Sequence, residues 1–177
     1  MASFAVVFFF AATGFTLNHA DWFINQQQTA EATGSVDRAW VSGRDTDVDR
    51  LRIVEYLRST HHIAGAMADF RIEAQECSVS FKGPGYSADI FIDRSTGHYQ
   101  LTENRLGLAA IVNDLHKGRD TGAPWRAFID VSAVMLVLIS LTGLVLIYFV
   151  HKHRVGGLLV LAAGVVLSVA LFWWFVP

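Results

Sequence analysis

The sequence is poor in cysteine, in proline and in charge, and each shortage excludes a type of site, chain or partner. Cys77 is the single cysteine, so the chain can form neither an internal disulfide nor a CxxC metal site. Three prolines and scattered glycines exclude a low-complexity chain. Charged residues make up 17% and the formal net charge is −2, so no basic face indicates a nucleic-acid partner.

Catalytic and metal-binding motifs are missing as well. The sequence contains no GxSxG motif, no HExxH motif and no Gly-rich phosphate loop. Cys77 has no flanking histidine and is expected to pack in a strand. The sequence therefore predicts no catalytic residue and no metal centre.

Apolar side chains, in contrast, are abundant and gather in three long runs. They make up 53% of the chain, and the mean hydropathy is +0.37. The runs cover residues 2–17, 127–150 and 156–177. The two later runs exceed the ~18 residues that indicate a membrane span, and a helix over residues 1–18 would reach about 27 Å. We expect transmembrane helices over residues 1–18, 127–150 and 157–176.

The first run could instead be a cleaved signal peptide. Its start, MAS, carries no positive charge, and no small-x-small cleavage site follows the apolar core. Both features favour a membrane span.

The orientation follows from charges and aromatic residues. The short loop over residues 151–156 holds Lys152 and Arg154, which predicts a cytoplasmic loop. Residues 19–125 and the C-terminus then lie outside, which in a Gram-negative cell is the periplasm. The aromatic residues agree with this orientation: the expected outer ends carry Trp22, Trp125, Trp173 and Trp174, and the inner end of the second span carries Tyr148.

The outer segment divides into a linker and a small domain. Residues 19–47 are polar and turn-rich and are predicted to be a linker. Residues 48–118 carry periodic patterns and are predicted to form the domain. Its first helix has Asp47 as the expected N-cap and Leu51, Val54 and Leu57 near helical spacing.

The rest of the domain is predicted to form strands followed by a helix. Short alternating runs separated by the turns KGPG and DRSTG predict three or four antiparallel strands. Leu108, Ile111, Val112 and Leu115 then lie at helical spacing, with Gly118 as the stop. The expected fold is a small α+β extracytoplasmic domain attached to three transmembrane helices.

The order of these parts resembles a known family. A span ending in TGFTLNH is followed by DRSTGHYQL, by LHKGRDTGAPWRAFIDVSA, by SLTGLVL and by a basic turn. This order is similar to the PepSY-associated transmembrane family in its short three-span form, over nearly the whole chain. The resemblance implies an inner-membrane protein with a periplasmic PepSY-like domain.

Larger relatives in that family are associated with ferric-siderophore reduction and hold b-type haem through membrane histidines. Soluble PepSY domains are associated with restraining peptidases. The resemblance thus adds two alternatives, a haem-linked electron carrier and a peptidase-restraining module. Relatives usually carry a histidine near the inner end of the first span, and this sequence does not.

A haem site would need two histidines at one depth on different segments. No histidine lies inside an expected span, and His151 and His153 share one loop. His19 and His116 both fall at the outer interface. They are the candidate ligand pair for haem b, although no cofactor is expected.

His116 also belongs to a positive cluster with Lys117 and Arg119. The cluster could end the helix, because a cation suits the negative helix terminus. It could also bind a phosphate-like group or an acidic loop of a partner.

Charges and small residues mark further contacts. Arg126 and Asp130 are one turn apart at the start of the second span and are expected to form a paired anchor. Trp22 and Trp125 are expected to be interfacial anchors.

The Thr-Gly pairs in AATGF and SLTGL predict close helix–helix contacts, within the chain or with other membrane subunits.

Three functions therefore remain open on the sequence. The favoured function is a non-catalytic accessory subunit that sits in the lipid bilayer and docks other membrane protein subunits through its outer domain. The alternatives are the haem-linked carrier in iron reduction and the peptidase-restraining module.

Overall fold

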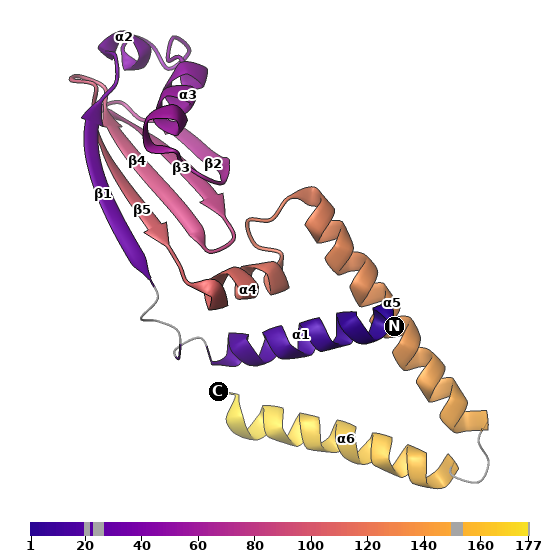
Figure 1. The fold of residues 1–177 in the computed structure, drawn as a ribbon. Helices are drawn as coiled ribbons and strands as arrows, with labels where there is room; N and C mark the ends of the chain where they lie inside the picture. The colour runs from indigo at the N-terminus through magenta and orange to yellow at the C-terminus, as the bar shows by residue number, and fades with distance from the viewer. Residues whose placement is uncertain (20–21, 23–26, 150–153, 177) are drawn as a thin grey trace. The chain divides into compact units, whose positions relative to one another are not determined.

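The computed structural model describes residues 1–19, 22, 27–149 and 154–176 (Figure 1). The loop histidines His151 and His153, and Lys152 between them, lie outside the described residues. The chain divides into two compact units, Met1–Ile129 and Asp130–Pro177, and each is considered by itself.

The first unit contains a five-stranded antiparallel sheet in the order β1-β5-β4-β3-β2. The strands are β1 (Gln28–Ser35), β2 (Ala66–Ile72), β3 (Glu76–Gly83), β4 (Tyr86–Asp93) and β5 (His98–Arg105). Strands β2 to β5 form the meander that the alternating runs predict. The KGPG turn joins β3 to β4, whose pairing begins at Gly83 and Tyr86.

Part of the predicted linker is instead a strand. β1 lies within residues 19–47 and pairs with β5 along its full length, from Gln28 opposite Arg105 to Ser35 opposite His98. A short helix, α2 (Arg38–Val41), follows it. The linker prediction was wrong here because β1 is an edge strand of small and polar residues, mostly exposed, and carries no apolar alternation.

The first predicted helix is α3 (Arg50–His61), and its cap differs from the prediction. Asp49, not Asp47, is the N-cap, and its side chain accepts a hydrogen bond from the Arg52 N–H. The inward face holds Ile53 and Leu57, whereas Leu51 is 67% exposed. Asp47 bonds Arg44 instead, which lowers the pKa of the Asp47 carboxyl.

Helix α3 covers one face of the sheet (Figure 1). Fully or nearly fully buried side chains gather between them: Ile53, Leu57, Cys77, Val79, Phe81, Ile90, Ile92 and Leu101. Each large apolar side chain buried in this way contributes roughly 1.5–3 kcal/mol. Because successive strand residues point to opposite faces, the intervening residues form a second face, which is polar.

The DRSTG turn between β4 and β5 holds the far end of the domain together. Asp93 accepts hydrogen bonds from the Ser95 hydroxyl and from the N–H groups of Ser95 and Thr96. Gly97 has φ +77°, and a Cβ there would lie 2.5 Å from the Val36 carbonyl oxygen. This close approach explains why the turn ends in glycine.

Arg94 in the same turn connects two loops through hydrogen bonds. Its guanidinium donates to the carbonyl oxygens of Val41, Gly43 and Glu73 at 2.7–3.0 Å and pairs with Asp45 at 3.0 Å. The side chain is only 10% exposed. Arg94 thus ties the segment after α2 to the β2–β3 turn.

Two helices are long and apolar enough to cross a membrane. They are α5 (Ala123–Phe149) and α6 (Arg154–Phe175), with mean hydropathy values of 2.5 and 2.6. In the second unit, a Cβ on Gly157 would lie 2.8 Å from Ile147, so this glycine permits a close contact between α5 and α6. Helix α1 (Ala2–Asn18) is apolar but has 17 residues, so two of the three expected spans have the length and composition of a membrane span.

Replacing Arg94 with alanine should lower the free energy of unfolding by roughly 2–4 kcal/mol, because three carbonyl groups and Asp45 lose a nearly buried charged donor. Thermal unfolding of the full chain in a non-ionic detergent measures this loss. Arg71→Ala is the matched control, since Arg71 is 71% exposed in its pair with Asp69 and should change stability little. Equal losses in the two variants would contradict this connecting role.

The Asp93 turn predicts a loss of stability in acid. Hydrogen bonds from the Ser95 hydroxyl and from the Thr96 and Ser95 amides lower the pKa of Asp93 to about 2. Ionised Asp93 therefore stabilises the fold fully above its ordinary pKa of 3.8, and the effect is lost as pH falls toward about 2. The melting-temperature gap between the wild type and Asp93→Ala should stay constant from neutral pH to about 4 and then close. A gap unchanged near pH 2 would disprove this role.

Candidate functional site

Helix α4 (Leu108–Lys117) contacts the β3–β4 turn, α1 and the first turn of α5. It forms where the apolar spacing predicted a helix, although Leu108 of the predicted apolar face is 76% exposed. Its cap residue Gly118 has φ +66°, and the Gly118 N–H bonds the carbonyls of Asp114 and Leu115. A left-handed glycine of this kind ends a helix at low steric cost, so the predicted stop is confirmed.

The first set of contacts joins α4 to the β3–β4 turn. The Asp114 carboxylate accepts a hydrogen bond from the Gly85 N–H at 2.8 Å, and the Leu106 N–H donates to the Gly85 carbonyl at 2.8 Å. Gly85 has φ +66°, and a Cβ there would lie 2.4 Å from Ile111. The turn therefore fits against α4 only with glycine at this position.

The second set joins α4 to α1. The Thr13 hydroxyl lies 2.5 Å from Nδ1 of His116, and the Thr16 hydroxyl donates to the Asn113 side-chain oxygen at 3.1 Å. Thr13 is 5% exposed, and the Phe10 ring meets the His116 ring edge-on at 5.2 Å. Two polar pairs thus join α4 to an otherwise apolar helix, in which each threonine hydroxyl also bonds a carbonyl of the preceding turn.

The third set joins α4 to the start of α5. Nε1 of Trp125 donates to the Leu115 carbonyl at 2.8 Å. The Trp125 ring also contacts Phe9 of α1 edge-on, with centroids 6.2 Å apart. The interfacial anchor role of Trp125 stays a prediction, and the structure shows that its ring N–H bonds the end of α4.

The structure gives the two candidate haem ligands different surroundings. His19 stacks on Trp22 at 4.1 Å and lies beside Phe15 at 4.7 Å. His116 lies at Thr13, six residues before His19, which is about 9 Å along a helix. Trp22, an expected membrane anchor, is 66% exposed. In the part of the chain that is described, no three His, Cys, Asp or Glu side chains are grouped to hold a metal ion.

The pair Arg126 and Asp130 stays a prediction. Both residues lie on α5, one turn apart. Asp130 begins the second unit, whereas Arg126 belongs to the first.

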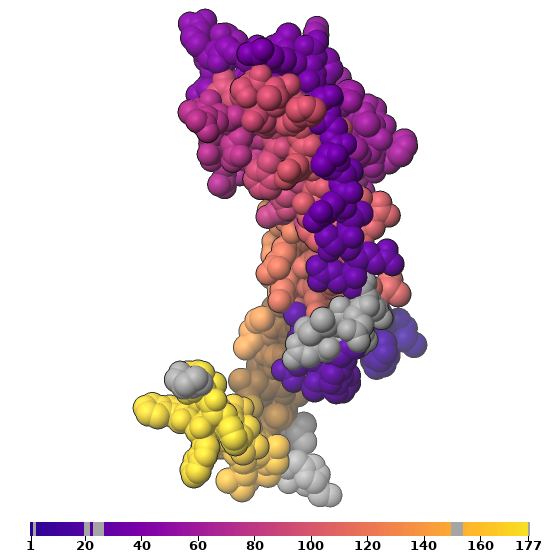
Figure 2. Space-filling view, turned by 90° about the vertical axis from the view of Figure 1, so that its left-hand side faces the viewer, coloured from indigo at the N-terminus to yellow at the C-terminus, as the bar shows by residue number. Residues whose placement is uncertain are grey.

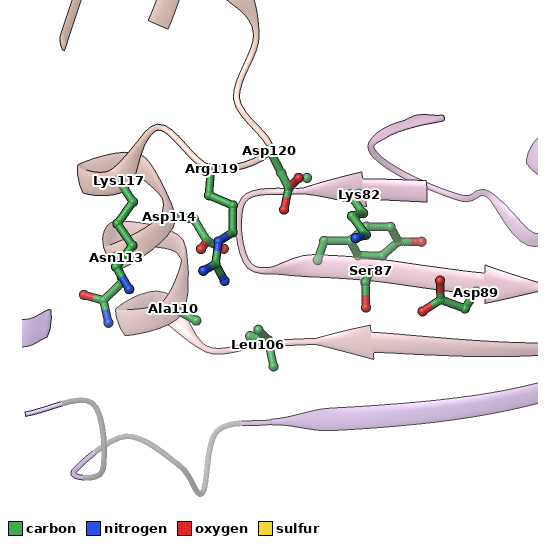
Figure 3. Close-up of a pocket in the computed structure, with 12 residues that line it drawn as sticks. Lys82, Ser87, Asp89, Leu106, Ala110, Asn113, Asp114, Lys117, Arg119 and Asp120 are labelled. Atoms are coloured by element: carbon green, nitrogen blue, oxygen red, sulfur yellow. The ribbon is translucent and has the colours of Figure 1, made fainter. Parts of the chain in front are cut away.

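A hollow of about 730 Å³ lies between α4 and the β3–β4 turn (Figure 3). Lys117 and Arg119, predicted as part of a positive cluster, line it, but His116 of that cluster lies at α1 instead. The charged lining residues are Lys82, Asp89, Asp114, Lys117, Arg119 and Asp120. The structure therefore divides the predicted cluster between a helix contact and an open site.

The polar face of the sheet carries a second candidate surface. Phe91 lies on this face, on the central strand β4, and is 49% exposed. Its pairing partner on β5 is Gln100. Two shallow hollows flank Phe91, one toward β2 and one toward the β4–β5 turn. The edge strand β1 beside this face is uncovered along its length (Figure 2).

Sequence reasoning missed several of these residues. The Thr-Gly pair of α1 was predicted at a helix contact, and a Cβ on Gly14 would indeed lie 3.7 Å from His116. The local pattern did not reveal that α4 is the helix that this Thr-Gly pair contacts. Phe91 gave a detectable signal, because it is an apolar residue at an outward position of an alternating strand.

Comparison with protein families matched the whole chain, residues 1–177, to a family described as "Putative PepSY_TM-like". Comparisons with curated proteins and with solved structures returned no match.

Replacing Trp125 with phenylalanine should loosen the end of α4. The variant keeps an aromatic ring beside Phe9 but removes the donor to the Leu115 carbonyl, a loss worth about 1 kcal/mol. Amide hydrogen exchange at Gly118 and Arg119 should quicken about fivefold, since their N–H groups bond carbonyls of the same helix end. Trp22→Phe should leave these amides unchanged, and equal exchange in both variants would refute the contact's role.

Proposed function

Because the chain belongs to the PepSY_TM-like family, we propose that it is a PepSY-type inner-membrane protein that docks another subunit of a membrane complex through its sheet domain. The family and the two long apolar helices support the membrane location. The docking role is supported mainly by one observation, the exposed Phe91 at the centre of an uncovered sheet face.

In this proposal α1 also crosses the membrane, which makes three spans with α5 and α6, and residues 19–125 are periplasmic. Arg154 lies over the Tyr148 ring at 3.9 Å, an arrangement that suits the inner interface expected for both residues. Trp173 and Trp174 are 81% and 85% exposed, as expected of an aromatic belt at the outer interface.

The surroundings of Phe91 are those of a binding face. Aromatic residues that anchor protein interfaces are typically central and ringed by polar residues that exclude water. Phe91 meets both conditions, since polar side chains of all five strands surround it on this face.

The charge of this face indicates the chemistry of the partner. Strand alternation places five carboxylates and two cations among the face's described residues: Glu31, Asp69, Glu76, Asp89, Asp93, Arg71 and Lys82. An acidic face attracts and orients a basic partner. We therefore expect a basic surface with an apolar pocket for the Phe91 ring.

The haem-linked and peptidase-restraining alternatives have less support. The His116 ring bonds Thr13 and packs edge-on against Phe10, and the His19 ring stacks on Trp22. These contacts favour a structural role for both residues. The peptidase alternative rests on the family resemblance alone.

A photo-crosslinking residue at Gln100, beside Phe91, tests the docking role in native membranes. One protein should be captured from Gln100 and not from Glu55, which is exposed on α3. The captured protein should bind the purified chain about 30-fold more weakly after Phe91→Ser, the loss typical of an anchor residue.

The control for this experiment is Leu51→Ser, which removes an exposed apolar side chain from α3. It should leave the affinity unchanged, and both variants should keep the wild-type melting temperature. If Phe91→Ser and Leu51→Ser bound the captured protein equally well, the sheet face would not be the docking surface.

A further inference from the structure

The hollow beside α4 contains charged groups that the fold does not use. Among the described residues, no ion pair within 4.0 Å involves Lys82, Lys117 or Arg119. All three side chains are exposed and line the same hollow. In Figure 3 the Arg119 guanidinium lies between α4 and the β3–β4 turn.

The carboxylates of the hollow are in a different position. Asp114 accepts the Gly85 N–H, and Asp89 accepts the Ser80 hydroxyl, so both have partners within the domain. Asp120 lies beside the β3–β4 turn, held in a left-handed conformation with φ +53°. Asp120 is exposed and has no side-chain hydrogen bond or ion pair among the described residues, so the hollow holds three unpaired cations and one unpaired carboxylate.

The position of the hollow in the fold indicates that it lies near the membrane interface. Its wall α4 is bonded to α1 through Thr13 and to Trp125 at the start of α5, one of the two apolar helices long enough to span. Lipid phosphates lie at the depth where a span leaves the hydrocarbon core and interfacial tryptophans gather. The hollow is thus next to a concentrated source of phosphate groups.

We propose that this hollow binds the phosphodiester group of a phospholipid headgroup. The Arg119 guanidinium offers paired N–H donors that match two phosphate oxygens, and the two lysines add point charges. With three cations and three carboxylates in the lining, the site suits a singly charged phosphodiester better than a free multivalent phosphate. Lys82 and Asp89 also belong to the Phe91 face, so the test of the lipid site changes only Lys117 and Arg119.

Lipid titration of the full chain tests this site. The protein in a non-ionic detergent is titrated with phosphatidylglycerol, and bound lipid is counted by native mass spectrometry. The double variant Lys117→Gln/Arg119→Gln should bind about 30-fold more weakly, at about fivefold for each cation removed at a membrane surface.

The matched control is Arg38→Gln/Arg44→Gln, which removes the same charge from exposed positions near α2. It should bind lipid as the wild type does, and equal melting temperatures should confirm that both double variants fold. Equal lipid affinity in the two double variants would overturn the proposal.

A competition with inorganic phosphate shows whether the site binds a lipid headgroup or free phosphate. If millimolar phosphate leaves the bound lipid in place, the ligand is the headgroup, as proposed. If phosphate displaces the lipid and binds the wild type alone, the site is one for free phosphate and the headgroup proposal fails.

Discussion

The placement of α1 and of the start of α5 against the sheet depends on the contacts of one ten-residue helix. α4 holds the sheet through Asp114 and Gly85, holds α1 through His116 and Thr13, and holds the start of α5 through the Leu115 carbonyl and Trp125. Each of these contacts is a hydrogen bond between one donor and one acceptor. Because these bonds have directions, α4 fixes how the sheet meets α1, which apolar contact alone would specify less well.

This arrangement leaves one face of the sheet without a covering helix among the described residues of the first unit. α3 fills the core on one face of the sheet, and α4 lies at the end of the β3–β4 turn, so neither helix covers the Phe91 face. At the opposite end, Arg94 and Asp93 hold the turns together by their own hydrogen bonds. The domain is thus stabilised from its ends and from one face. It can present the other face to a partner without losing core contacts.

The sequence predicted the elements with strong periodicity and missed those defined by distant contacts. The helix α4, the Gly118 stop and the meander were confirmed, because each is encoded locally. β1 was missed because its stability comes from pairing with β5, about 70 residues away. The cap at Asp49 was misplaced by two residues, since several acidic residues precede α3 and only the backbone geometry selects one. His116 was recognised as a candidate, but its partner Thr13 is 103 residues away, and no local pattern reveals such a pair.

The central claim is that α4 and α1 are joined through His116 and Thr13. A double-mutant cycle tests it, with Thr13→Val, His116→Ala and the combined variant unfolded as full chains in the same detergent. If the hydroxyl and the imidazole bond each other, the two losses should fall short of additivity by about 1 kcal/mol, a coupling typical of residues in contact. Additive losses, within about 0.3 kcal/mol, would show that the pair does not join the two helices and would contradict the account.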